Sequence, residues 1–202
     1  MMHFRGLALL AVVGLAACAD SQKARIANPN TSYLPSNGSL ASTPGAGEES
    51  DGISYWDGDG VQGPPSVVIY LNEQRAYFYK GDQLVGVSQV SAGREGYDTP
   101  PGSYKIIQKD KDHASNLYGD YVDAAGNIVQ KDVELKKDPK PPGATFRGAP
   151  MPFFMRITGG VGMHKGYLPG YPASHGCIRM PGKMAEIFFS NVEVGTPVTV
   201  VR

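Results

Sequence analysis

One short segment of the chain gathers side chains that are suited to nucleophilic chemistry. Cys177 ends the run Ser174-His175-Gly176-Cys177, and His164 lies thirteen residues before it. A cysteine attacks as its thiolate, so it needs a base or a positive field nearby, and histidine exchanges protons near neutral pH. Gly176 allows a backbone bend that can direct amide N–H groups at a developing oxyanion. The segment therefore predicts a cysteine nucleophile that is served by a histidine.

Metal sites are the alternatives for these residues. Cys177 and two histidines could ligate zinc, which then needs a fourth ligand or water, and His113 is the one further histidine after residue 66. A lone cysteine or histidine can also be structural.

A calcium loop is a further alternative elsewhere in the chain. Residues 57–60 read Asp-Gly-Asp-Gly, but the third acid and the closing glutamate of a calcium loop are missing, so a polar turn is the favoured interpretation.

The elements that must position these residues are mostly strands. β-rich runs with turn residues between them predict strands at 67–71, 76–79, 84–90, 104–107 and 198–201. One helix is expected over 181–191, where Pro181 stands at the start and Met184, Ile187 and Phe188 share a face. The prediction is a mainly β domain over 66–202, a sandwich or mixed sheet with one short helix after the cysteine.

Residues 108–150 break this pattern. They are polar and contain Pro139, Pro141 and Pro142. Loops of this length are usually functional or disordered, so we expect a long excursion from the domain.

The N-terminus has the features of an export signal. Arg5 precedes an apolar run from Leu7 to Leu15 that is too short to span a bilayer. Leu15-Ala16-Ala17-Cys18 resembles a bacterial lipobox, which implies a signal peptide over 1–17 and lipidation of Cys18. Cleavage by an ordinary signal peptidase is the alternative.

The segment that follows Cys18 is interpreted as a flexible spacer. Residues 18–65 are rich in Ser, Asn, Gly, Pro and Thr. Ala19, rather than an acid, follows Cys18, and Asp20 comes one residue later. This favours a periplasm-facing lipoprotein of the outer membrane.

Composition excludes some partners. Nineteen basic and nineteen acidic residues give a formal net charge of zero, and no basic stripe suggests nucleic-acid binding. The 26 glycines and 16 prolines have no repeat period, which indicates a turn-rich β protein rather than a collagen-like one.

Three segments together resemble one known family. Ser174-His175-Gly176-Cys177 followed by Ile178-Arg179-Met180, with His164 upstream, is similar to the active-site signature of the L,D-transpeptidase (YkuD-like) catalytic domain. Thr99-Pro100-Pro101-Gly102-Ser103-Tyr104 is similar to the family's Thr-Pro-x-Gly-x-Tyr segment, and residues 72–77 fit its first hairpin. The resemblance covers about 66–201 and implies an L,D-transpeptidase-type fold.

The resemblance implies a role for each residue of the signature. Cys177 would be the nucleophile and His164 its base, oriented by the backbone carbonyl of Lys165. The N–H groups of Gly176 and Cys177 would form the oxyanion hole. The supporting residues would be His175 lining that hole, Ser174 bracing the loop, and Arg179 holding the loop or a substrate carboxylate. The short interval between His164 and Cys177 and the lysine after His164 depart from the commoner pattern, which implies altered substrate access with the chemistry retained.

The implied activity is peptidoglycan transpeptidation without a cofactor. Cys177 would form a thioester with a stem tetrapeptide, and an amine on another stem or on a wall-anchored protein would accept the acyl group. Residues 108–150 are the expected place of acceptor specificity. An L,D-carboxypeptidase or amidase of the same fold and a non-catalytic wall-binding lipoprotein are the alternatives.

Overall fold

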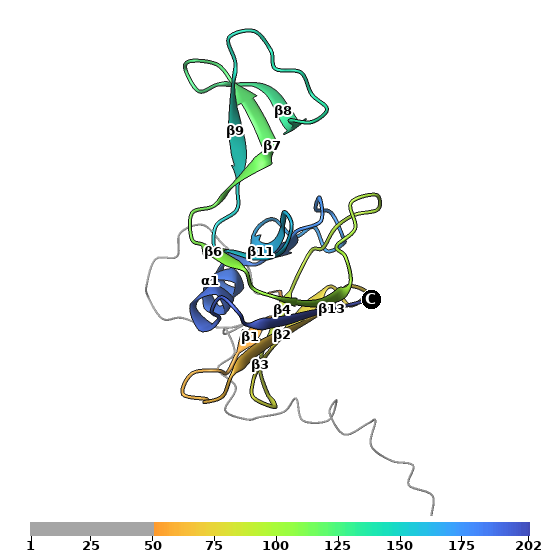
Figure 1. Ribbon diagram of the computed structural model, residues 1–202, viewed down its shortest axis with the longest axis vertical. Coiled ribbons are helices and arrows are strands. Elements are labelled where there is room, and N and C mark those ends of the chain that lie inside the picture. Colours follow the sequence, from red (N-terminus) through yellow and green to blue (C-terminus); the bar gives the residue numbers. More distant parts are fainter. Residues whose placement is uncertain (1–50) are drawn as a thin grey trace, which may run out of the picture. The chain divides into compact units, whose positions relative to one another are not determined.

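The chain from residue 51 onward folds almost wholly into strands. A computed structural model describes residues 51–202 (Figure 1). Its elements are β1 (Tyr55–Trp56), β2 (Pro65–Tyr70), β3 (Arg75–Lys80), β4 (Gln83–Gln89), β5 (Gly102–Lys105), β6 (Gln108–Asp110), β7 (Ala114–Val122), β8 (Ile128–Glu134), β9 (Thr145–Pro150), β10 (Phe154–Thr158), β11 (Val161–Lys165), β12 (Ile178–Met180), α1 (Gly182–Asn191) and β13 (Pro197–Val201).

The strands form three sheets. The largest has the order β1-β4-β3-β2-β13-β5 and is mixed, because β13 runs parallel to β2. The second has the order β12-β11-β10-β6, and β11 and β12 are parallel in it. The third, β8-β7-β9, is antiparallel. The prediction of a mainly β domain with one short helix is confirmed.

The main core lies between the largest sheet, the second sheet and α1. Along β2 and β3, buried and partly exposed residues alternate, so that Val67, Ile69 and Phe78 point into the core. The ring of Phe78 meets that of Phe188 from α1 edge to face, with 4.9 Å between ring centroids. Met163 of β11 is fully buried in the same cluster.

The helix begins and ends where the sequence indicates. Pro181 is its N-cap residue, and a proline costs nothing at a helix start because the first N–H groups have no partner within the helix. Met184, Ala185 and Phe188 are buried against the sheets, at helical spacing. Val192 leaves the helix in an extended conformation.

The strand expected over 104–107 ends earlier, at Lys105. The Ile106 N–H donates to the Thr196 carbonyl oxygen, whereas the Ile107 N–H donates to that of Arg156. The chain thus crosses from the largest sheet to the second sheet within two residues. This crossing delivers β6 to the edge of the second sheet.

Residues 108–150 form strands instead of an irregular excursion. β7, β8 and β9 build the third sheet, which stands at one end of the described part of the chain (Figure 1). Its own core is small: Tyr121, Val133 and Ala144 are buried, and Phe146 packs against them. The strands are mostly polar because few of their side chains are covered, which explains why apolar alternation did not predict them.

The folded part also begins before residue 66. β1 pairs with β4, and Trp56 is only 8% exposed, with its ring centroid 5.1 Å from that of Phe78. Within the expected spacer, residues 54–65 are therefore part of the fold. Residues 57–60 form a polar turn in which Asp59 accepts a hydrogen bond from the Trp56 indole at 2.8 Å. The predicted signal peptide, Cys18 and the spacer up to residue 50 lie outside the described residues.

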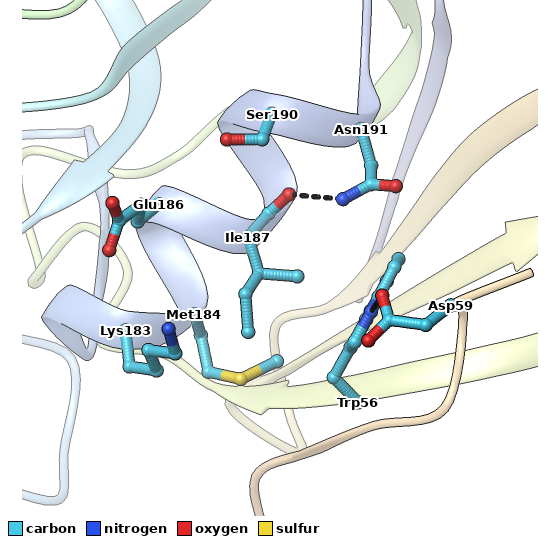
Figure 2. Close-up of a pocket in the computed structure, with 8 residues that line it drawn as sticks. All are labelled: Trp56, Asp59, Lys183, Met184, Glu186, Ile187, Ser190 and Asn191. Atoms are coloured by element: carbon cyan, nitrogen blue, oxygen red, sulfur yellow. Dashed lines mark hydrogen bonds between the residues drawn. The ribbon is translucent and has the colours of Figure 1, made fainter.

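Two further features concern function. A pocket of about 380 Å³ lies between α1 and the segment that carries Trp56 and Asp59 (Figure 2), but none of the candidate site residues lines it. Among residues 51–202, no helix is both long and apolar enough to cross a membrane.

Candidate active site

The second sheet places Cys177 and His164 on the same face. Met163 pairs with Ile178, and His164 pairs with Arg179. Met163 and Ile178 are fully buried in the core. Since successive side chains along a strand alternate between faces, His164, Arg179 and Cys177 project from the opposite side. Cys177 comes one residue before β12, and continuation of this register would set it diagonally beside His164.

His164 is held in a defined tautomer. Its Nδ1 lies 2.7 Å from the carbonyl oxygen of Lys165, the contact that the family resemblance implies. A carbonyl only accepts hydrogen bonds, so Nδ1 carries the proton and Nε2 is free to accept one. Burial lowers the pKa of His164 to about 4, although the Lys165 carbonyl acts in the opposite direction. At neutral pH the imidazole is uncharged.

The Cys177 thiol is partly exposed, and its surroundings shift its pKa in opposite directions. Its Sγ lies 3.5 Å from the carbonyl oxygen of Gly160. Burial raises the pKa of Cys177, while a hydrogen bond from the Gly162 backbone and the charges of Arg156 and Arg179 lower it. The thiol is therefore protonated in the resting site, and the neutral His164 is the group able to receive its proton.

The loop before Cys177 is fixed by hydrogen bonds. Ser174 Oγ donates to the Cys177 carbonyl oxygen at 2.5 Å and accepts from the Gly176 N–H at 3.0 Å. Thr99 Oγ1 donates to the Gly176 carbonyl oxygen at 2.7 Å. Gly176 has φ +107°, a conformation that favours glycine. Ser174 thus braces the loop, but the Gly176 N–H faces Ser174 instead of being available for an oxyanion.

His175 points into an aromatic cluster. Its ring stacks on Tyr118 with 4.3 Å between centroids, and it meets Tyr97 edge to face at 4.7 Å. Its Nε2 lies 2.7 Å from Arg94 Nη2, so this nitrogen accepts a hydrogen bond from the guanidinium. Burial, followed by the charge of Arg94, lowers the pKa of His175. Tyr118 belongs to β7, so the third sheet reaches the loop that carries Cys177.

The segment 91–99 supports the loop, and residue types alone did not single it out. The Ser91 N–H donates to the Arg179 carbonyl oxygen at 2.9 Å, and the Arg179 N–H donates to that of Ser91 at 3.0 Å. The Ala92 N–H donates to Gln74 Oε1 at 2.8 Å. Gln74 and Thr99 belong to the segments that carried the family resemblance, which was the signal that could have identified them. Arg94 had no such signal.

Two candidate side chains do not converge on the thiol. Lys165 is exposed, and it is its backbone carbonyl that contacts His164. His113, considered as a zinc ligand, instead pairs with Asp110 at 3.1 Å and stacks on Phe154. In the described part of the chain, no three His, Cys, Asp or Glu side chains are grouped so as to hold a metal ion.

Comparison with known proteins identifies the family. The model of the L,D-transpeptidase catalytic domain (YkuD) matches residues 64–200. An L,D-transpeptidase from Mycobacterium smegmatis has a similar fold, with a TM-score of 0.52 and 18% identity over 69% of this chain and 59% of that chain. An L,D-transpeptidase (Yku) from Stackebrandtia nassauensis gives a TM-score of 0.50 and 18% identity over 71% and 60%. This chain thus spans less than two thirds of those chains. No curated protein matches it. Because the family model covers more than half of its residues, the chain belongs to the L,D-transpeptidase catalytic domain family.

Proposed function

We propose that this protein is a peptidoglycan L,D-transpeptidase with Cys177 as its nucleophile and His164 as its base. The supporting observation is the placement of a neutral, tautomerically fixed imidazole diagonally beside a thiol on one face of the second sheet. A binding role alone requires neither this tautomer nor this neighbour. The proposal therefore favours catalysis over a non-catalytic wall-binding lipoprotein.

The reaction has two steps. Cys177 Sγ attacks the carbonyl of the L-centre residue in a stem tetrapeptide while its proton passes to His164 Nε2. The Cys177 N–H is the backbone donor for the resulting oxyanion, since the Gly176 N–H is bonded to Ser174. Collapse of the intermediate breaks the peptide bond, and His164 returns the proton to the departing D-alanine amine. A thioester on Cys177 remains.

An amine then completes the transfer. It attacks the thioester carbonyl and loses a proton to His164, and the Cys177 thiolate leaves and is reprotonated. An amine on another stem gives a cross-link, and an amine on a wall-anchored protein gives protein attachment. Attack by water would give the alternative L,D-carboxypeptidase activity. Lipidation at Cys18 would keep the enzyme in the cell envelope, facing the periplasm from the outer membrane.

Product masses test the proposal. Full-length wild-type protein incubated with tetrapeptide muropeptides should release D-alanine and give dimers in which the L-centre carbonyl of one stem is joined to an amine of another. Cys177→Ala should give neither product while keeping its near-UV circular dichroism. Comparable turnover by a folded Cys177→Ala protein would exclude the cysteine mechanism.

A further inference from the structure

Three arginines surround the site without an acidic partner. Arg94 contacts His175, Arg179 follows Cys177 on the same face, and the charge of Arg156 acts on the thiol. The ion pairs found among residues 51–202 involve other cations, namely His113, Lys137 and Arg147. Unpaired guanidinium groups beside a reactive thiol indicate a site for an anionic ligand.

Arg156 has the most specific position of the three. In the second sheet, Arg156 pairs with Gly162 on β11 and with Gln108 on β6. The pairing of Met163 with Ile178 sets Gly162 beside Cys177. A side chain at residue 162 would collide with β10, because an added Cβ would lie 2.6 Å from the Met155 carbonyl oxygen. Gly162 therefore contributes no side chain to this row, and the Phe154 ring lies over it instead, with its Cε2 also 2.6 Å from that added Cβ.

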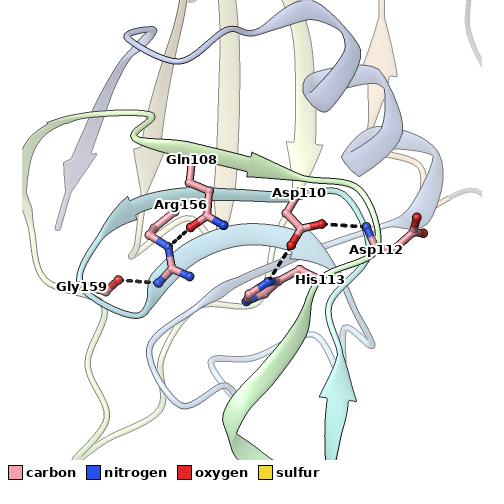
Figure 3. A network of polar contacts seen from close by, with 6 residues as sticks. All are labelled: Gln108, Asp110, Asp112, His113, Arg156 and Gly159. Atoms are coloured by element: carbon pink, nitrogen blue, oxygen red, sulfur yellow. Dashed lines mark hydrogen bonds and ion pairs between the residues drawn. The ribbon is translucent and has the colours of Figure 1, made fainter.

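The Arg156 guanidinium is held by neutral groups (Figure 3). Its Nε donates to Gln108 Oε1 at 2.7 Å, and its Nη1 donates to the Gly159 carbonyl oxygen at 2.6 Å. Its central carbon lies 5.0 Å from the centroid of the Phe154 ring. Asp110, the acid on the same strand as Gln108, is instead engaged with His113 and with the Asp112 N–H.

This support fixes the direction of the guanidinium without neutralising its charge. Gln108 and Gly159 occupy Nε and Nη1, which leaves Nη2 to donate to a ligand. A preoriented guanidinium loses less conformational freedom on binding than a free one, and its full charge is available to an anion.

We infer that Arg156 is a specificity-determining residue that binds a carboxylate of the donor peptide, next to the carbonyl that Cys177 attacks. This inference rests on the proposed function, which supplies the donor. Two groups on such a donor have the required chemistry. One is the terminal carboxylate of the departing D-alanine. The other is the side-chain carboxylate of the L-centre residue, in donors where that residue is the diamino acid diaminopimelate.

Binding to a protein that cannot react tests the inference directly. Calorimetry would compare full-length Cys177→Ala with Cys177→Ala/Arg156→Gln, using three tetrapeptides: the unmodified one, one ending in D-alaninamide, and one amidated on the diamino-acid side chain. Arg156→Gln should weaken binding of the unmodified peptide by about tenfold, the scale of a charge-assisted hydrogen bond. Amidation of the recognised carboxylate should weaken binding by a similar factor when Arg156 is present. It should change the affinity little when Arg156 is replaced.

Matched variants control for charge and for folding. Arg147→Gln removes the same charge from β9, where Arg147 faces Asp120 at 3.7 Å, and should leave donor affinity unchanged. Arg156→Lys keeps the charge and should recover part of the affinity. Equal losses in Arg156→Gln and Arg147→Gln, or tight binding of both amidated peptides to the protein with Arg156, would overturn the inference.

Turnover by the reactive protein separates this inference from the proposed function. Affinity that depends on Arg156, without any product from the wild type, would contradict the transpeptidase proposal but support the carboxylate site. Product formation that is indifferent to Arg156→Gln and to both amidations would contradict the carboxylate site alone.

Discussion

At the scale of single residues, the proposed catalysis would start from an uncharged pair, Cys177 and His164. Burial lowers the pKa of His164 to about 4 and raises the pKa of Cys177. Both shifts favour the neutral form of each side chain. In the proposed mechanism the thiol would therefore give its proton to the imidazole during attack, instead of resting as a thiolate beside an imidazolium.

The pKa of His164 predicts an unusual acid limit of activity. His164 can act as a base only when it is neutral, so kcat/KM should fall as pH drops through about 4 and not through the ordinary histidine value of 6.5. Initial rates of D-alanine release between about pH 3 and pH 8 would measure this profile. An acid limb near pH 6.5 in a protein that remains folded would contradict the uncharged-pair mechanism.

At the scale of elements, the third sheet and the site are connected through His175. Its ring lies against Tyr118 of β7 and Tyr97 of the 91–99 segment. Tyr97 in turn receives a hydrogen bond from Lys137 at 2.7 Å and donates one to Glu134 at 3.2 Å. Residues 114–150 therefore form part of the wall beside the cysteine loop. This placement is compatible with the expectation that residues 108–150 influence acceptor choice.

Substitution of Tyr118 would test this connection between the third sheet and the cysteine loop. Tyr118→Ala removes the ring that stacks on His175 and should lower kcat by about threefold to tenfold, because an aromatic pair contributes about 0.5–1.5 kcal/mol. Tyr118→Phe keeps the ring and should behave like the wild type. The His175 ring resonances in NMR spectra should broaden or shift in the alanine variant only. Unchanged rates and unchanged resonances in Tyr118→Ala would show that the contact does not order the loop.

The packing of β1 leads to a separate prediction about the stability of the fold. Trp56 packs on Phe78, and an added Cβ at Gly86 would lie 2.7 Å from its ring, so the indole fills a tightly bounded site. Trp56→Ala should lower the free energy of unfolding by about 3–5 kcal/mol. Val129→Ala, at a residue that is 51% exposed, should change it little. Urea unfolding of both variants would measure the difference, and similar midpoints would mean that β1 adds nothing to the fold.

At the scale of the whole molecule, the proposed lipid tether would decide where the catalytic unit works. The formal net charge of zero gives the protein no general attraction to anionic surfaces, so proximity to the wall has to come from an anchor or from substrate binding. Two or more acyl chains suffice for stable membrane attachment. A lipidated Cys18 would supply them.

Replacement of Cys18 tests the anchor independently of catalysis. Cys18→Ser should move the exported protein from the membrane fraction to the soluble fraction, while its rate on soluble tetrapeptides stays that of the wild type. Mass spectrometry of the wild-type N-terminal peptide should show acyl chains on Cys18. A soluble wild type, or an unmodified Cys18, would remove the lipoprotein proposal and leave the catalytic one intact.

The sequence by itself determined the features that depend on near neighbours. Pro181 and the spacing of Met184 and Phe188 predicted α1, because helix periodicity and terminal prolines act within a few residues. β-rich runs bounded by turn residues predicted β2, β3, β4 and β13 for the same reason. The motif around Cys177 indicated the family and the thiol chemistry without any knowledge of sheet order.

Tertiary structure decided everything that depends on register and packing between distant segments. Pairing of β10 with β11 brings Arg156 into line with Cys177, and folding of residues 114–150 brings Tyr118 onto His175. Ser174 takes the Gly176 N–H that the motif alone assigned to the oxyanion. Because a shift of one residue in a strand turns each side chain to the opposite face, such contacts cannot be deduced from composition or spacing along the chain.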